Sequence, residues 1–304
     1  MSTSRSLLTT IDEACDYPKF TDSETKLRVE AVTSDKTAEI LRFLSARPIH
    51  TVMMNGLIRD NGLISPLNRG TFYACRNQAR RLEGVALIGH LTLLETQTER
   101  ARKALALQAQ QNKHKHLIVG EESRIDRFLQ YYSAGGQKMR HSQREMLLEL
   151  KSPVISAPTS NYDIRLATLE DLELIVPVQA ELAEENSKVN PLVVDPKGFR
   201  ERCARRIKKG RTWVITEGSE LIFKTEVMVD TREVIYLEGV YVSPERRGKG
   251  FGSTYLSKLC NQLLQNTESI CVLVNESNES ARAFYPKVGF SFNCWYEHVF
   301  LQSI

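Results

Sequence analysis

The chain has 304 residues, enough for two domains of ordinary size, and 41% of them are hydrophobic and 26% charged. The net charge of +4 is mild and does not by itself predict nucleic-acid binding. No apolar run approaches the ~20 residues of a membrane helix, the N-terminal stretch has no secretory core, and the six cysteines show no C-x-x-C spacing. These features predict a cytoplasmic protein that uses no membrane, no nucleic acid and no metal.

The first half alternates between strand and helix patterns. Residues 1–24 show no periodicity and are expected to form a tail, and 25–150 are expected to form a first α/β domain. Strands are predicted at 26–34, 71–75, 83–96 and 116–120, and helices at 35–46, 98–113 and 122–136.

Residues 151–160 hold two prolines and four hydroxyl residues, which is typical of a linker. The pattern then restarts, and 161–304 are expected to form a second domain. It opens with a strand and a Thr168-led helix that Pro177 should kink or break. Further strands are predicted at 211–218, 220–230, 234–244, 269–275 and 290–302, and helices at 199–210, 253–267 and 279–289.

The two domains begin alike, each with a strand, a polar turn and a helix. This similarity suggests a duplicated architecture whose first copy lost a loop, although two α/β segments can also resemble each other by chance.

A glycine-rich stretch, RRGKGFG (246–252), follows the strand predicted at 234–244. A loop between a strand and a helix leaves backbone N–H groups free at the positive end of the helix dipole, which favours phosphate. Glycines let the ligand approach the backbone, and Arg246, Arg247 and Lys249 add positive charge. The alternative is a turn that merely needs glycines.

Three phosphate-binding patterns were compared with this loop. A P-loop needs Gly-Lys-Ser/Thr at a spacing that is absent here. The dinucleotide fingerprint needs G-x-G-x-x-G, whereas the loop has G-x-G-x-G late in the chain. The third pattern, [RQ]-x-x-G-x-[GA], which wraps the pyrophosphate of coenzyme A, is matched by residues 247–252.

With this loop and a second signature, VLVNESNESARAFYPKVGF (272–290), about 30 residues further on, the region 160–304 resembles the GNAT superfamily of acyl-CoA N-acyltransferases. The first half resembles the poorly characterised domain that precedes some bacterial GNAT domains. The resemblance implies an α/β (α+β) fold with a mixed, largely antiparallel sheet flanked by helices, and a degenerate GNAT-like first domain. It also implies acetyl-CoA as co-substrate and direct transfer to an amine in a ternary complex.

The resemblance assigns roles to individual residues. Tyr285 would be the general acid that protonates the leaving thiolate, and Glu238 the base that deprotonates the amine. Tyr285 could instead only pack, Glu238 could be hydrogen-bonded at the sheet or bind the acceptor, and Glu226 is a weaker rival base. If the enzyme bound the amine already in its neutral form from solvent, it would need no dedicated base.

The resemblance also assigns the parts of acetyl-CoA to residues. The backbone of residues 240–242 and the Asn278 side chain would contact the pantetheine arm. The glycine loop would bind the pyrophosphate, and Arg282 would lie near the adenosine end. Asn278 could instead only cap the helix after it. The expected cofactor-binding residues are Val240, Tyr241, Val242, Arg247, Gly248, Lys249, Gly250, Phe251, Gly252, Ser253, Asn278 and Arg282.

Seven basic residues lie within 200–211, and in a helix Arg202, Arg205, Arg206 and Lys209 would share a face. The run is either a solvated surface or the border of a site for an acidic acceptor or partner. The acceptor itself is a small-molecule amine or a protein amino group. The alternative function is a CoA-binding regulatory module without turnover, whose first domain serves dimerisation, as in a homodimer, or partner docking.

Overall fold

The computed structural model describes residues 27–112, 117–153 and 162–302, so the expected tail and most of the expected linker lie outside the described residues. Twelve strands of the described residues form one sheet, in the order β1-β2-β3-β4-β5-β12-β6-β11-β10-β9-β8-β7. Every neighbouring pair in that part of the chain is antiparallel except β4 with β5 and β10 with β11. The expected fold class, a mixed and largely antiparallel sheet, is confirmed.

The strands are β1 (Arg28–Ala31), β2 (Gly70–Arg76), β3 (Leu82–Gly89), β4 (Leu91–Thr96), β5 (Leu117–Glu121), β6 (Met139–Leu150), β7 (Arg165–Leu166), β8 (Thr212–Glu217), β9 (Glu220–Asp230), β10 (Val234–Val242), β11 (Ser269–Asn275) and β12 (Ser291–Leu301). The helices are α1 (Thr37–Leu44), α2 (Pro48–Asn61), α3 (Glu99–Gln110), α4 (Glu122–Tyr132), α5 (Leu172–Ser187), α6 (Pro191–Val194), α7 (Pro196–Lys208), α8 (Phe251–Leu263) and α9 (Glu279–Phe284).

Each half of the chain repeats one arrangement of strands. In the first half β1 to β4 are antiparallel neighbours and β5 follows parallel to β4. In the second half β7 to β10 are antiparallel neighbours and β11 follows parallel to β10. The shared order agrees with the duplicated architecture that the sequence suggested.

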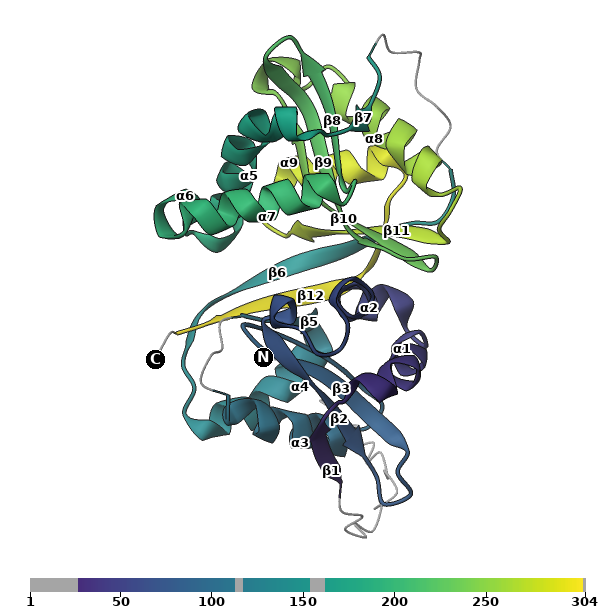
Figure 1. Ribbon diagram of the computed structural model, residues 1–304, viewed down its shortest axis with the longest axis vertical. Coiled ribbons are helices and arrows are strands. Elements are labelled where there is room, and N and C mark those ends of the chain that lie inside the picture. Colours follow the sequence, from purple (N-terminus) through teal and green to yellow (C-terminus); the bar gives the residue numbers. More distant parts are fainter. Residues whose placement is uncertain (1–26, 113–116, 154–161, 303–304) are drawn as a thin grey trace, which may run out of the picture.

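The strand that follows this arrangement is exchanged between the halves. β6, from the first half, pairs with β11 of the second half, and β12, from the second half, pairs with β5 of the first. The two exchanged strands also pair with each other, and Figure 1 shows them running side by side between the halves. One continuous sheet therefore joins both halves.

Helices cover both faces of each half (Figure 1). In the first half α1 and α2 pack on one face, and α3 and α4 on the other. In the second half α5 and α7 cover one face and α8 the other. The cluster under α2 also contains Tyr236 of β10 and Tyr296 of β12, so this core is shared between the halves.

Helix α2, which the sequence analysis did not predict, makes the closest helical contact between the halves. Gly56 lies so near β9 that a Cβ there would be 2.5 Å from a methyl group of Val229. At the end of α2, Asp60 receives hydrogen bonds from Arg211 of the second half at 2.6 and 2.7 Å.

Two local expectations differ from the structure. Of the two outcomes predicted at Pro177, a kink or a break, the break is wrong, because α5 runs through this residue; proline removes one backbone donor, while Ile175, Val176 and Ala180 stay buried against α7 and the sheet. The single run predicted at 83–96 is instead two paired strands, β3 and β4, that turn at Gly89 and His90. The hairpin predicted around Gly218 is confirmed.

Candidate active site

The site begins where β10 and β11 separate. Their parallel pairing covers three positions and ends at Tyr236 and Cys271. β10 continues to Val242 and remains paired with β9 on its other side. The edge of β10 beyond Tyr236 therefore faces a wedge between diverging strands, where its backbone N–H and C=O groups have no partner on β11.

A β-bulge shapes this edge of β10. Glu238 pairs with Glu226 and Tyr241 with Lys224, so β10 holds one residue more than β9 between these pairs. Gly239 in the bulge has φ +63°, and a Cβ there would lie 3.0 Å from the Lys224 Nζ. The bulge turns the half-buried residues 240–242, the expected pantetheine-binding segment, along the wedge.

The glycine loop closes one end of the wedge and opens α8. Gly248 and Gly250 have φ of +72° and +80°, which favours glycine, and a Cβ at either would point into open space. The amides of residues 248–250 donate to no backbone carbonyl of the described residues, and those of the first turn of α8 have no intrahelical partner. The loop and the start of α8 therefore offer N–H donors to a ligand.

Side chains fix the loop in place. Arg247 donates from Nε to the carbonyl oxygen of Val242 at 3.0 Å, and the Ser253 hydroxyl donates to the carbonyl oxygen of Gly250 at 2.9 Å. Lys249 is exposed. At Gly252 a Cβ would lie 3.0 Å from both Phe284 and Val242, so a glycine allows α8 to approach these residues.

Asn278 and Arg282 lie at α9, near the second signature. The Asn278 Oδ1 accepts a hydrogen bond from the Ala281 amide at 2.9 Å and so caps α9. The Arg282 guanidinium donates to the carbonyl oxygen of Glu276 at 3.2 Å. The cap is thus confirmed, and the coenzyme contacts of both residues remain predictions.

Tyr285 follows α9 and lies in the core cluster beneath α8. Its ring makes edge contacts with Phe284 and Phe290 at centroid distances of 5.2 and 5.3 Å. Burial raises the pKa of the phenol far above its usual value, with a smaller contribution from Cys260. The phenol is therefore protonated at neutral pH and can donate a proton.

The two candidate bases lie in different surroundings. Glu226 is buried between Arg206 and Lys224, whose Nζ is 3.4 Å from Oε1. Burial raises the pKa of Glu226, but Lys224 and Arg206 outweigh it and hold the pKa below the usual value. Glu238 is half-buried and burial raises its pKa. Glu226 is therefore an ion-pair partner, and Glu238 is the carboxyl group better suited to take a proton.

A third carboxyl group, which the sequence analysis missed, belongs to Glu145 of the exchanged strand β6. It pairs with Asn275 of β11 and Tyr296 of β12, and its side chain is 8% exposed. Burial raises the pKa of Glu145 to about 7, and the charge of Glu238 adds to the effect. The nearest basic atom is the Nδ1 of His298, 3.5 Å from Oε1, and burial lowers the pKa of that imidazole to about 4.

Glu145 predicts a pH dependence of stability. Its folded-state pKa, about 7, lies above the ordinary 4.5, so the stability it contributes is complete below pH 4.5 and is lost as pH rises through 7. Glu145→Gln removes this dependence, and the free energy of unfolding of the variant should rise relative to wild type by about 2.5 kcal/mol between about pH 5 and about pH 8. Because His298 titrates with the opposite sign, the informative quantity is the difference in unfolding free energy between wild type and Glu145→Gln, measured by urea denaturation. If this difference were the same at both pH values, the raised pKa of Glu145 would be wrong.

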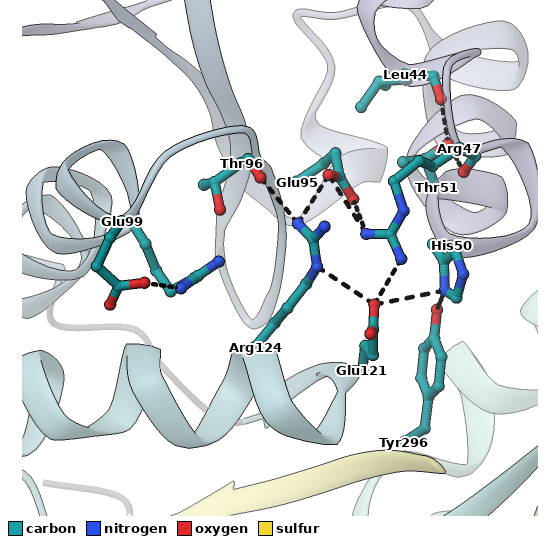
Figure 2. Close-up of polar contacts among 11 residues, drawn as sticks. Leu44, Arg47, His50, Thr51, Glu95, Thr96, Glu99, Glu121, Arg124 and Tyr296 are labelled. Carbon is teal, nitrogen blue, oxygen red and sulfur yellow. Dashed lines mark hydrogen bonds and ion pairs between the residues drawn. The ribbon is translucent and has the colours of Figure 1, made fainter. Parts of the chain in front are cut away.

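The corresponding wedge of the first half is filled by ion pairs (Figure 2). The pairing of β4 with β5 also covers few residues and ends at Thr92 and Ile118. Beyond it, Arg47 bridges Glu95 at 3.1 Å and Glu121 at 2.6 Å.

Arg124 of α4 forms a second bridge across this wedge. It contacts Glu95 at 2.9 Å and Glu121 at 3.2 Å, and it donates to the carbonyl oxygen of Thr96 at 2.8 Å (Figure 2). β4 ends at Thr96 and α3 begins at Glu99, with Thr98 as its cap and no glycine loop between them. The first half thus bridges its wedge with ion pairs, whereas no ion pair of the described residues joins β10 to β11.

A cavity of about 30 Å³ adjoins these bridges, lined by the four bridging residues themselves together with Tyr236, Tyr296, His50 and apolar side chains. It has room for about one or two water molecules. The His50 Nδ1 lies 3.1 Å from the Tyr296 hydroxyl (Figure 2), and burial lowers the pKa of His50 to about 4.

The basic run of α7 is largely paired within the chain. Arg206 contacts Glu226, Arg202 contacts Asp195 at 3.0 Å and Lys209 contacts Asp60 at 3.4 Å. These bases therefore neutralise carboxylates of the chain itself, and an acidic acceptor remains a prediction.

Comparisons with known proteins agree with this geometry. Residues 180–290 match the acetyltransferase (GNAT) family. A search among curated proteins gave no sequence match. Among the described residues, no helix is long and apolar enough to cross a membrane.

Solved structures align over nearly the whole chain. An acetyltransferase of the GNAT family from Colwellia psychrerythraea is 13% identical with a TM-score of 0.57, covering 91% of this chain and 100% of that one. A Drosophila protein is 13% identical with a TM-score of 0.65, covering 90% and 98%. A tandem GNAT protein from the clavulanic acid biosynthesis pathway is 13% identical with a TM-score of 0.53, covering 91% and 98%. At this identity the likeness shows a shared fold across both halves.

Proposed function

Because the region of residues 180–290 belongs to the GNAT acetyltransferase family, which uses acetyl-CoA, we propose that the chain moves an acetyl group from acetyl-CoA directly to a primary amine. The observation that carries the proposal is the open wedge of β10 and β11 with the row of amides from the glycine loop at its end. The first half, whose wedge is bridged by Arg47 and Arg124, has neither feature.

The loop would bind the pyrophosphate through the amides of residues 248–253. The positive end of α8 and the side chains of Arg247 and Lys249 would add favourable charge. The unpaired edge of residues 240–242 would pair with the amides of the pantetheine arm as a strand pairs with a neighbour. These contacts would place the thioester near the bulge at Gly239.

Two side chains would then serve the transfer. Glu238 takes a proton from the ammonium, the amine nitrogen attacks the carbonyl carbon, and the carbon–sulfur bond breaks. Tyr285, whose buried phenol stays protonated, gives its proton to the departing thiolate, and the second proton that the nitrogen loses as the amide forms restores the phenol. Glu238 shares its sheet face with Tyr236 and not with the Tyr285 cluster, so acid and base would approach from opposite faces.

The test measures acetyl-CoA binding by calorimetry and CoA release by thiol detection. The amines are 1,4-diaminobutane, butylamine, 4-aminobutanoate and a lysine-containing peptide. Binding with thiol release on at least one amine is expected. Gly250→Ala, which forces a side chain into φ +80° and into the cradle, should weaken acetyl-CoA binding at least tenfold, about 1.4 kcal/mol. Binding without release on every amine would overturn catalysis and leave a CoA-binding module.

A further inference from the structure

Glu145 and Glu238 lie on one face of the sheet. Side chains alternate along a strand, so Glu238 shares a face with Tyr236 and Glu145 shares one with Leu147. Tyr236 and Leu147 belong to the same core cluster, whereas Tyr285 belongs to the cluster on the other face. Both carboxyl groups therefore face away from the proposed acid.

The two residues lie on strands two apart in the sheet, with β11 between β6 and β10. Glu145 pairs with Asn275, four residues beyond the point where β11 leaves β10 at Cys271. Glu238 stands two residues beyond the same point on β10. The charge of Glu238 contributes to the raised pKa of Glu145, and both groups contribute to the raised pKa of Tyr236, where the wedge begins.

More than nine-tenths of Glu145 is buried. Among the described residues its one close basic partner is His298, whose Nδ1 lies 3.5 Å from Oε1, and burial keeps that imidazole neutral at neutral pH by lowering its pKa to about 4. A carboxylate buried this deeply without a partner of opposite charge is costly. An ammonium group supplies three donors and the opposite charge.

We propose that Glu145 binds the acceptor amine together with Glu238, so that the first half of the chain contributes a residue to the acetyl-transfer site and the acceptor is a cationic amine. This inference rests on the proposed acetyltransferase function. An amine that carries its own carboxylate would place a negative charge near two acidic side chains and would be disfavoured. The class that fits is an aliphatic amine with a second positive charge, such as a diamine or a lysine side chain in a basic context.

The experiment compares three four-carbon amines that differ in charge. With wild-type protein, kcat/KM should decrease from 1,4-diaminobutane to butylamine to 4-aminobutanoate. Glu145→Gln should raise the KM for 1,4-diaminobutane at least tenfold, leave the KM for acetyl-CoA unchanged, and reduce the preference for the diamine over 4-aminobutanoate. Glu145→Asp keeps the charge and should recover part of the loss.

Glu149→Gln is the matched control, because Glu149 lies on the same strand and face but is held by Asn293 and Lys151, each at 3.1 Å. It should leave all three amines unaffected. A Glu145→Gln variant that behaves like the control, or a wild-type preference for 4-aminobutanoate, would overturn the inference while leaving the acetyltransferase function intact. Acetyl-CoA binding without thiol release on any amine, the lysine peptide included, would instead overturn the function and the inference together. Thermal unfolding verifies that each variant is folded. If Glu145→Gln does not fold, the amine series is measured with Glu145→Asp instead.

Discussion

Replacing Tyr285 with phenylalanine is expected to lower kcat by roughly 10²- to 10⁴-fold while the Kd for acetyl-CoA stays nearly constant. The change removes the proposed proton donor to the thiolate but keeps the ring that packs against Phe284 and Phe290. Thiol release under saturating acetyl-CoA measures kcat, and calorimetry measures the affinity.

Tyr255→Phe is the control, because Tyr255 is a buried tyrosine of the same core cluster. It should keep kcat within a few-fold of wild type. The raised pKa of Tyr285 adds a further expectation, since wild-type activity should not fall on the alkaline side before the usual pKa of tyrosine is reached. A Tyr285→Phe variant with wild-type kcat would remove the acid role.

The largest loss of stability is expected from Glu226→Ala, with a free energy of unfolding lower by about 3–5 kcal/mol. Glu226 is 1% exposed and Lys224 is fully buried, so the substitution leaves a buried ammonium without its carboxylate. Arg206 loses the same partner. Urea denaturation at neutral pH measures the change.

Glu173→Ala provides the comparison, because Glu173 pairs with Arg200 at the surface and should contribute less than about 1 kcal/mol. Adding Lys224→Met to Glu226→Ala removes the stranded charge and should recover part of the loss. If Glu226→Ala instead lowered kcat strongly with unchanged stability, Glu226 would be acting as a base and its ion-pair role would be wrong.

The strand, glycine loop and helix of the proposed donor side could be predicted from the sequence because their determinants are local. Gly248, Gly250 and Gly252 follow one strand and open one helix, and their spacing distinguishes among the known phosphate loops. The strand before them and the hairpin at Gly218 are encoded by short alternating runs and a turn residue. The structure agrees with these local predictions.

The proposed acceptor side could not be predicted, because it depends on pairings between distant segments. β6 begins with a largely polar run, residues 139–145, that lacks the alternation typical of a half-buried strand. This run becomes a strand because β12 pairs with it along its length, and β11 pairs with β6 from Glu145 onward. Nothing near Glu145 in the sequence indicates that it shares a sheet face with Glu238.

The exchange of β6 and β12 also has a consequence for how the chain folds. His50 and Tyr296, 246 positions apart, are neighbours, and contacts of such separation slow folding because a long loop must close first. Until β12 has been synthesised, β5 presents an open edge, the kind of surface at which nascent chains aggregate. Once both strands are in place, each pairs with a strand of the other half. A backbone cleavage between β6 and β7 would therefore leave two fragments that the sheet still holds together.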